Sequence, residues 1–327
     1  MQTTTQTAKQ TLIAQLQTDI WADLDEGNSF PAVRPLLAHY TSIAVFEQMM
    51  ANDEVWFSNP LFMNDLEELR FGMIEGARVF RESSTLREAL STQEVHTRLI
   101  HHFDHLFNEF DTKHAFQTYI MCLSLHQSED NDGRLSMWRG YGAGGNGVAI
   151  VFDTTKLEAN EASPLIVGPI NYGSIAQRLD WINEKVNVLA GILKGQDLDD
   201  DTLFHAAYHW IERLKLFSLF TKHIGFAEEN EWRVVYMSER DRNGALSQMH
   251  SYAITARGAE PKLKLKVKPL EGVFSEDLEF DKIVNRVILG PTTSTVLTAN
   301  TVKRILEQKG KGKLAQKIVP STIPFRP

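Results

Sequence analysis

Two carboxylates and an arginine lie close together at the entrance of a predicted strand. Glu229 and Glu231 flank Asn230, and the apolar run 232–236 follows. Side chains two residues apart on a strand point to the same face. Arg233 is therefore expected beside Glu231, where it can hold that carboxylate ionised and oriented. Such a carboxylate could stabilise a positive charge that develops in a reaction, although carboxylates at strand entrances are often simply solvated.

A histidine ends the first predicted strand. Residues 36–40 are a short apolar run that closes with His39 and Tyr40, and Thr41 and Ser42 follow. Ser42 is a typical helix N-cap, so these polar residues are expected where a strand leads into a helix. A side chain at such a position projects from a rigid edge. A buried structural histidine is equally compatible with this pattern.

Polar residues gather again after the second predicted strand, 54–58. Ser58, Asn59, Asn64 and Asp65 lie where this strand opens into the next helix. Turn and capping chemistry explains Asn59 and Asp65 by itself. Ser58 and Asn64 remain candidates for binding a ligand.

Two aromatic residues precede a glycine-rich loop. Trp138 and Tyr141 are three apart on a short predicted helix, where they could fill the core or stack on a planar ring. The glycines of 142–147 match G-x-G-x-x-G as text. A dinucleotide fold needs a strand before that loop and a helix after it, and here the order is reversed. We therefore reject that fold and expect a tight turn.

Other reactive residue types have simpler interpretations. His205 and His209 share a helix face, as do His101 and His105, but the glutamate that zinc hydrolases place after the first histidine is missing. These pairs are typical of ordinary amphipathic helices. Cys122 lies in an apolar strand, where a buried and inert thiol is usual. We expect no metal.

Composition indicates a globular protein. The 327 residues are 43% hydrophobic and 23% charged, with a net charge of −8. Residues 257–327 carry 14 Lys and Arg against 7 Asp and Glu, so this end is basic and could attract nucleic acid or be a solvated surface. No apolar run is long enough for a membrane span, and a single cysteine fits a reducing compartment. We expect a cytoplasmic protein with no membrane partner.

The hydrophobic patterns predict a mixed α/β fold. Helices are expected at 8–24, 43–50, 65–81, 85–110, 174–194, 200–222 and 293–309, and strands at 36–40, 54–58, 116–125, 147–153, 231–237, 251–257, 261–268 and 286–290. We predict an N-terminal helix within 1–30 and one catalytic-type domain at 31–327, with a helical insertion at about 174–222. The strand within 261–268 alternates lysine with Leu or Val, which favours a sheet with one wet face.

Taken in order, these segments resemble a bacterial family defined as a domain of unknown function. The shared motifs are His39-Tyr40-Thr41, Trp56 to Asp65, Trp138 to Phe152, Glu229 to Arg233, and Ile288 to Pro291. More remotely, the layout is similar to the His-Tyr-Glu class of ADP-ribosyltransferases. That resemblance implies a split, mixed sheet flanked by helices.

The resemblance also implies a function and a site. The protein would be an NAD-dependent ADP-ribosyltransferase or NAD glycohydrolase, in a toxin or phage-defence setting, with NAD as co-substrate and no metal. His39 would bind the NAD ribose, the backbone near Tyr40 and Thr41 would bind the nicotinamide amide, and Glu231 or Glu229 would be catalytic. The class expects a tyrosine on its second strand, whereas this chain has Trp56 there and Trp138 and Tyr141 later. The remaining binding candidates are Ser58, Asn64, Trp138, Tyr141 and Arg233.

Two other classes of function stay open. One is a metal-dependent nuclease or phosphodiesterase that uses Asp65, Glu67, Glu229 and Glu231 as magnesium ligands and the basic C-terminal region for nucleic acid. The other is a ligand-sensing module without catalysis. For the ADP-ribosyltransferase or NAD glycohydrolase, the partners would be a small nucleotide and an acceptor macromolecule, either protein or nucleic acid.

Overall fold

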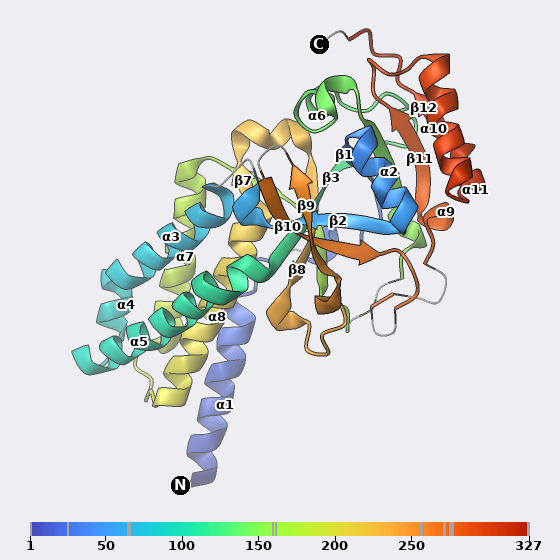
Figure 1. The fold of residues 1–327 in the computed structure, drawn as a ribbon. Coiled ribbons are helices and arrows are strands. Elements are labelled where there is room, and N and C mark those ends of the chain that lie inside the picture. The colour runs from blue at the N-terminus through green and yellow to red at the C-terminus, as the bar shows by residue number, and fades with distance from the viewer. Residues whose placement is uncertain are drawn as a thin grey trace. The chain divides into compact units, whose positions relative to one another are not determined.

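The chain folds into a helical unit and a sheet unit, each built from three separated segments. The helical unit comprises residues 1–25, 63–117 and 171–224, and the sheet unit comprises 26–62, 118–170 and 225–327. The computed structural model describes residues 2–24, 26–63, 67–158, 160, 162–255, 258–270, 273–274 and 278–325 (Figure 1). The predicted insertion at about 174–222 and the predicted domain from 31 to 327 stay predictions.

The helical unit is an assembly of amphipathic helices around α8. Its helices are α1 (Gln2–Asp19), α3 (Glu67–Glu82), α4 (Ser84–Ala89), α5 (Gln93–Glu109), α7 (Ile175–Leu193) and α8 (Asp200–Phe220). Helices α1, α3 and α5 all contact α8, and α4 contacts α7 (Figure 1). A short parallel pair, β6 (Asn171–Gly173) and β7 (Thr221–His223), also belongs to this unit.

The helix predicted over 85–110 is in fact two helices. Leu90 ends α4 with an extended backbone, and the Thr92 side chain then accepts a hydrogen bond from Val95 N at 3.2 Å. A threonine in this position starts a new helix because it satisfies an amide that has no partner within the helix. Apolar residues lie on both sides of the break, at Leu86, Leu90, Val95 and Leu99, so the sequence pattern did not mark it.

A mixed, open sheet dominates the other unit. Its strands are β1 (Leu36–Thr41), β2 (Glu54–Ser58), β3 (Thr118–His126), β4 (Val148–Asp153), β5 (Leu165–Pro169), β8 (Glu231–Met237), β9 (His250–Thr255), β10 (Gly258–Lys266), β11 (Val284–Leu289) and β12 (Ile318–Pro320). The main order is β12-β11-β4-β1-β3-β2-β10-β9, and β8 joins β3 to β5. Of these pairings, β11 with β12 is parallel and the others are antiparallel. The predicted mixed α/β fold with flanking helices is confirmed.

Helices flank the sheet on both faces. The larger core lies between the sheet and helices α2 (Ile43–Asn52) and α10 (Val296–Gln308), and it buries Phe46, Met49 and Val302. The smaller core lies under α6 (Leu135–Gly140), where Met137 and Trp138 pack on strand residues. The short helices α9 (Phe280–Ile283) and α11 (Gly312–Ala315) complete this unit.

Local signals in the sequence agree with most of these elements. Strands β2 and β8 begin and end where the apolar runs predict, and the Ser42 side chain caps α2 by accepting from Val45 N at 3.2 Å. The predicted cap at Asn64 and Asp65 lies outside the described residues. Strand β5 was not predicted, because Leu165–Pro169 is short and contains both glycine and proline.

Candidate functional site

Strand β3 has one partner along one edge and two along the other. Ser124 pairs with Glu231 of β8 on one side and Ala38 of β1 on the other. Four residues earlier, Ile120 pairs with Val235 of β8 and with Ser58 of β2. The partner of β3 therefore changes from β1 to β2 around Cys122. We call this position the split, defined by the ends of β1 and β2 on either side of Cys122.

His39 lies at the split. Its Nδ1 is 3.0 Å from the carbonyl oxygen of Cys122, so Nδ1 carries the proton and donates. Burial lowers the pKa of His39, the bond to Cys122 opposes that change, and the positive charge of Lys262 adds to it. The imidazole is thus neutral near pH 7, and its Nε2 is in the acceptor form.

A lysine approaches the split from β10. Lys262 donates to Ser58 Oγ at 2.9 Å and to Glu260 Oε2 at 3.1 Å. Glu260 also accepts from Thr255 Oγ1 at 2.8 Å and is almost completely buried. Sequence reasoning missed Lys262 because it read the alternating lysines as a wet face.

The other lysines of that row are also engaged. Lys264 lies 4.3 Å from the centre of the Trp56 ring, and Lys266 donates to Glu54 at 2.7 Å. Trp56 and Glu54 are buried. This face of β10 and β2 is therefore partly covered, and its lysines pair with specific groups.

Glu231 and Arg233 form a buried ion pair, as their two-residue spacing predicts. Arg233 Nε is 2.7 Å from Glu231 Oε1, and one terminal nitrogen is 3.3 Å from Oε2. Glu231 is 4% exposed and Arg233 only 1%. The pair sits on β8 beside the split, because Arg233 pairs with Cys122 in the sheet register.

The register separates two of the predicted site residues from Glu231. Ala38, Ser124 and Glu231 are directly paired, so they share one face of the sheet. His39 and Thr41 alternate with that face and belong to the opposite one. The expectation that His39, Thr41 and Glu231 converge in one pocket is therefore wrong. Tyr40, by contrast, shares the face of Glu231.

Tyr40 and Trp138 are buried together. Their rings meet edge to face with centroids 4.8 Å apart. The Tyr40 hydroxyl accepts from Arg134 N at 2.9 Å, and Trp138 Nε1 donates to the Asp132 carbonyl at 2.8 Å. Burial raises the pKa of Tyr40 to about 12. Trp138 is fully buried, so it forms core under α6 and presents no ring face to a ligand.

Tyr141, the aromatic residue predicted together with Trp138, is accessible to solvent. It is 41% exposed, and its hydroxyl donates to Glu229 Oε1 at 2.9 Å. The backbone carbonyl of Glu229 accepts from Ser124 Oγ at 2.6 Å. Glu229 and Tyr141 therefore lie together near the surface, while Glu231 is buried.

The glycine-rich loop after Tyr141 makes a close turn, as expected. Gly144 has a φ of +62°, which favours glycine. A Cβ at Gly147 would lie 2.1 Å from the Thr41 carbonyl oxygen, so only glycine allows β4 to start beside the end of β1. The tight turn of this loop therefore allows β4 to pair with β1 in the observed register.

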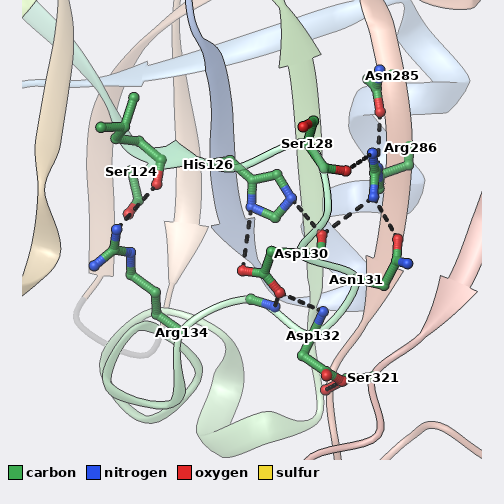
Figure 2. A network of polar contacts seen from close by, with 12 residues as sticks. Ser124, His126, Ser128, Asp130, Asn131, Asp132, Arg134, Asn285, Arg286 and Ser321 are labelled. Atoms are coloured by element: carbon green, nitrogen blue, oxygen red, sulfur yellow. Dashed lines mark hydrogen bonds and ion pairs between the residues drawn. The ribbon is translucent and has the colours of Figure 1, made fainter.

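A polar network around residues 127–134 was not predicted from the sequence. His126 is 2.8 Å from the Asp130 carbonyl through Nε2, and the Asp130 carboxylate accepts from the amides of Asp132 and Gly133 (Figure 2). Arg286 of β11 donates to the Ser128 carbonyl at 2.6 Å and also contacts Asn131 and the Asp130 carbonyl (Figure 2). The clustered acids and glycine of this loop were its only sequence signal.

The same loop is attached to the C-terminal segment. Asp132 accepts from the Ser321 hydroxyl at 3.1 Å and from the amide and hydroxyl of Thr322. The bond from the Thr322 amide lowers the pKa of Asp132, with burial opposing it and the hydroxyls adding to it. The loop is thus held by β11 and by the segment after β12.

Within the described residues, no group of three or more His, Cys, Asp or Glu side chains is arranged to hold a metal ion. Asn64 and Asp65 lie outside these residues, and nothing is described of the Glu67 side chain. No helix in the described part of the chain has the length and apolar character needed to span a membrane.

The fold and the polar groups at the split, such as Lys262, Glu231 and Arg233, define a mixed α/β protein with a candidate site on β3. A family model described as "Protein of unknown function (DUF2971)" matches residues 137–234. The match covers less than a third of the chain and includes Trp138, Tyr141, Glu229, Glu231 and Arg233. It supports the predicted resemblance to a domain-of-unknown-function family. No curated protein and no solved structure matches the chain.

Proposed function

We propose that the sheet unit binds NAD and cleaves the bond between its nicotinamide and ribose, as an ADP-ribosyltransferase or an NAD glycohydrolase. The observation that carries this proposal is the split of β3. It brings a serine–lysine pair and the Glu231–Arg233 pair to adjoining positions of one sheet, with the neutral His39 on the opposite face from Glu231. The remote resemblance to ADP-ribosyltransferases supports the same site. An ADP-ribosyltransferase-like fold is part of this proposal.

The groups other than His39 have roles in binding. His39 itself, on the opposite face from Glu231, would support the end of β1 through the Cys122 carbonyl and would not contact the dinucleotide. Lys262 would place its positive charge near the two phosphates, with Ser58 beside it. Tyr141, the exposed aromatic, could stack on a base or on nicotinamide.

Glu231 is the proposed catalytic carboxylate. As the C1′–N bond breaks, its electron pair leaves with nicotinamide, and positive charge builds on the ribose as in glycoside hydrolysis. Arg233 orients this carboxylate, which would bind a ribose hydroxyl and stabilise that charge. The acceptor then forms the new bond to C1′ and releases its proton to solvent.

The choice between transfer and hydrolysis depends on the acceptor. Water gives an NAD glycohydrolase, and a nucleophile on a protein or nucleic acid gives an ADP-ribosyltransferase. Glu229, which lies at the surface with Tyr141, is the group closest to where such an acceptor would approach. A toxin or phage-defence role, with its macromolecular acceptor, belongs to this proposal as well.

A second function is favoured by one observation. Glu231 and Arg233 are 4% and 1% exposed, which restricts the access of a substrate to them. A ligand-sensing module without catalysis would need only the outer groups, Tyr141 and Glu229. This alternative predicts binding of NAD or a related nucleotide without turnover.

The test is incubation of the purified chain with NAD, with and without EDTA, followed by chromatography of nicotinamide and ADP-ribose. Binding is measured separately by calorimetry. We expect nicotinamide release that EDTA does not change. Binding without release would support the sensing module. The absence of both would reject the two proposals, and cleavage of nucleic acid abolished by EDTA would favour a nuclease.

A further inference from the structure

The segment that leads into Glu231 has an unfavourable backbone conformation. Asn230 has a φ of +42°, in the left-handed region that side chains other than glycine rarely adopt. Its amide donates to the Ala227 carbonyl at 3.2 Å, and its carbonyl accepts from Leu125 N at 2.8 Å. Such a conformation persists where the surroundings hold it. It matters here because Asn230 lies between Glu229 and Glu231.

Arg134 is one of the side chains that reach this segment from other elements, and it contacts both Glu228 and Asn230. One of its terminal nitrogens donates to the Glu228 carbonyl at 3.0 Å. With the Asn230 amide turned so that its oxygen faces the guanidinium, that oxygen accepts from both terminal nitrogens at 3.0 and 2.9 Å. The planar fork of arginine suits such a double contact. Arg134 therefore holds the backbone before Asn230 and the Asn230 side chain together.

Arg134 is itself held in place at its backbone. Its amide donates to the Tyr40 hydroxyl, and Tyr40 packs against Trp138. The residues before it belong to the network of Asp130, Asp132 and Arg286 (Figure 2). A side chain that projects from such a fixed loop can transmit its position to what it binds.

We propose that Arg134 is a positioning residue: it holds the segment 228–230 so that Glu229 and Glu231 are oriented for the reaction. This inference rests on the proposed function, because it assigns Arg134 to the same site. Arg134 acts through the backbone and through Asn230. It thereby links the loop at 127–134, and the C-terminal residues bound to it, to the two carboxylates.

The first test compares Arg134→Lys with Arg139→Lys. Arg139 lies on the adjacent helix α6, is exposed, and its guanidinium is 5.2 Å from the Phe325 ring. Hydrogen exchange of residues 225–231, a thermal melt and the kcat and KM for NAD turnover are measured. Arg134→Lys should speed exchange in 225–231 and lower kcat on the order of 10-fold, with a smaller change in KM. Arg139→Lys should leave all of these as in the wild type.

A second variant isolates the contact to Asn230. Glycine adopts the left-handed conformation without strain, so Asn230→Gly removes the side-chain acceptor and keeps the backbone geometry. If Arg134 acts through this contact, the double variant Arg134→Lys/Asn230→Gly should lose no more activity than the less active of the two single variants. Additive losses would overturn the proposal.

The two proposals fail differently. A wild-type chain that does not consume NAD rejects the proposed function, and the exchange experiment still decides the role of Arg134. Unchanged exchange at 225–231 in Arg134→Lys overturns the positioning role whatever the activity. If Arg134→Lys lowers the melt throughout the protein, Asn230→Gly decides: faster exchange confined to 225–231 supports the role, and unchanged exchange removes it.

Discussion

The helical unit and the sheet unit each bury charged side chains, and they do so in different ways. In the helical unit, Asp23 accepts from Trp181 Nε1 at 2.6 Å and forms ion pairs with Lys185 and Arg213, each at 2.8 Å. These partners come from α7 and α8, and Asp23 follows α1. The cluster therefore connects three segments far apart in the sequence. This link gives a structural reason for the burial of Lys185 and Arg213.

The Glu231–Arg233 pair of the sheet unit connects residues two apart on one strand. A contact of this kind adds no long-range link between segments, while the removal of both charges from water is costly. Burial of a charge pair is therefore not by itself a sign of function. The Glu231–Arg233 pair lies beside the split, and for this reason we assign it a chemical role in the proposed function.

Glu231→Gln has the largest expected effect. We expect NAD turnover to fall on the order of 10²-fold or more, because the neutral amide cannot stabilise a developing positive charge. The thermal melt should change little. Glu228→Gln is the matched control, since the exposed Glu228 contacts Arg134 through its carbonyl oxygen. Wild-type turnover in Glu231→Gln with an unchanged melt would remove this residue from the mechanism. A collapsed melt would show that the pair is structural.

Asp23→Ala tests whether the charged cluster of the helical unit has a structural role. It leaves Lys185 and Arg213 buried without this carboxylate, so the free energy of unfolding should fall by about 2–3 kcal/mol. NAD turnover of the folded protein should be unchanged. The measurement is urea denaturation alongside Asp201→Asn, which removes one exposed partner of Lys9 and should cost less. Equal losses in the two variants would contradict a structural role for the Asp23 cluster.

Tyr141→Phe and Glu229→Gln examine the outer part of the site. Tyr141→Phe removes the hydroxyl that donates to Glu229, a bond worth about 1 kcal/mol, so turnover should change less than about 10-fold. Glu229→Gln should also cost less than Glu231→Gln, because Glu229 lies in the segment before the strand. Steady-state kinetics of both variants gives the comparison. A larger loss in Glu229→Gln than in Glu231→Gln would make Glu229 the catalytic carboxylate.

The smallest expected effect is a pH dependence in the helical unit. Burial lowers the pKa of His96, and the charge of Arg87 adds to this change. The unfolded state therefore takes up this proton at a higher pH than the folded state. Stability is complete above the unfolded pKa, about 6.5, and decreases as the pH falls through the folded pKa. His96→Met should flatten this dependence in urea titrations between pH 7 and pH 5. An unchanged slope would show that other groups cause it.

Residues with local signals were predicted well. Ser42 caps its helix, Glu231 and Arg233 meet on one face of β8, and the glycines before β4 form a tight turn. These outcomes follow from capping, the two-residue period of a strand and the freedom of glycine, which depend on near neighbours. The roles of Trp138 and Tyr141 did not follow from such signals. One is core and the other exposed, although they lie one helical turn apart.

The type and approximate bounds of most elements follow from the sequence alone, because apolar periodicity and end signals lie within each segment. The tertiary structure, in contrast, places β1 and β2 along one edge of β3. It also decided that His39 and Glu231 belong to opposite faces, and that Lys262 and Arg134 reach the site. These features depend on strand order and register. Both are set by contacts between residues far apart in the chain, and a shift of one residue would reverse every face.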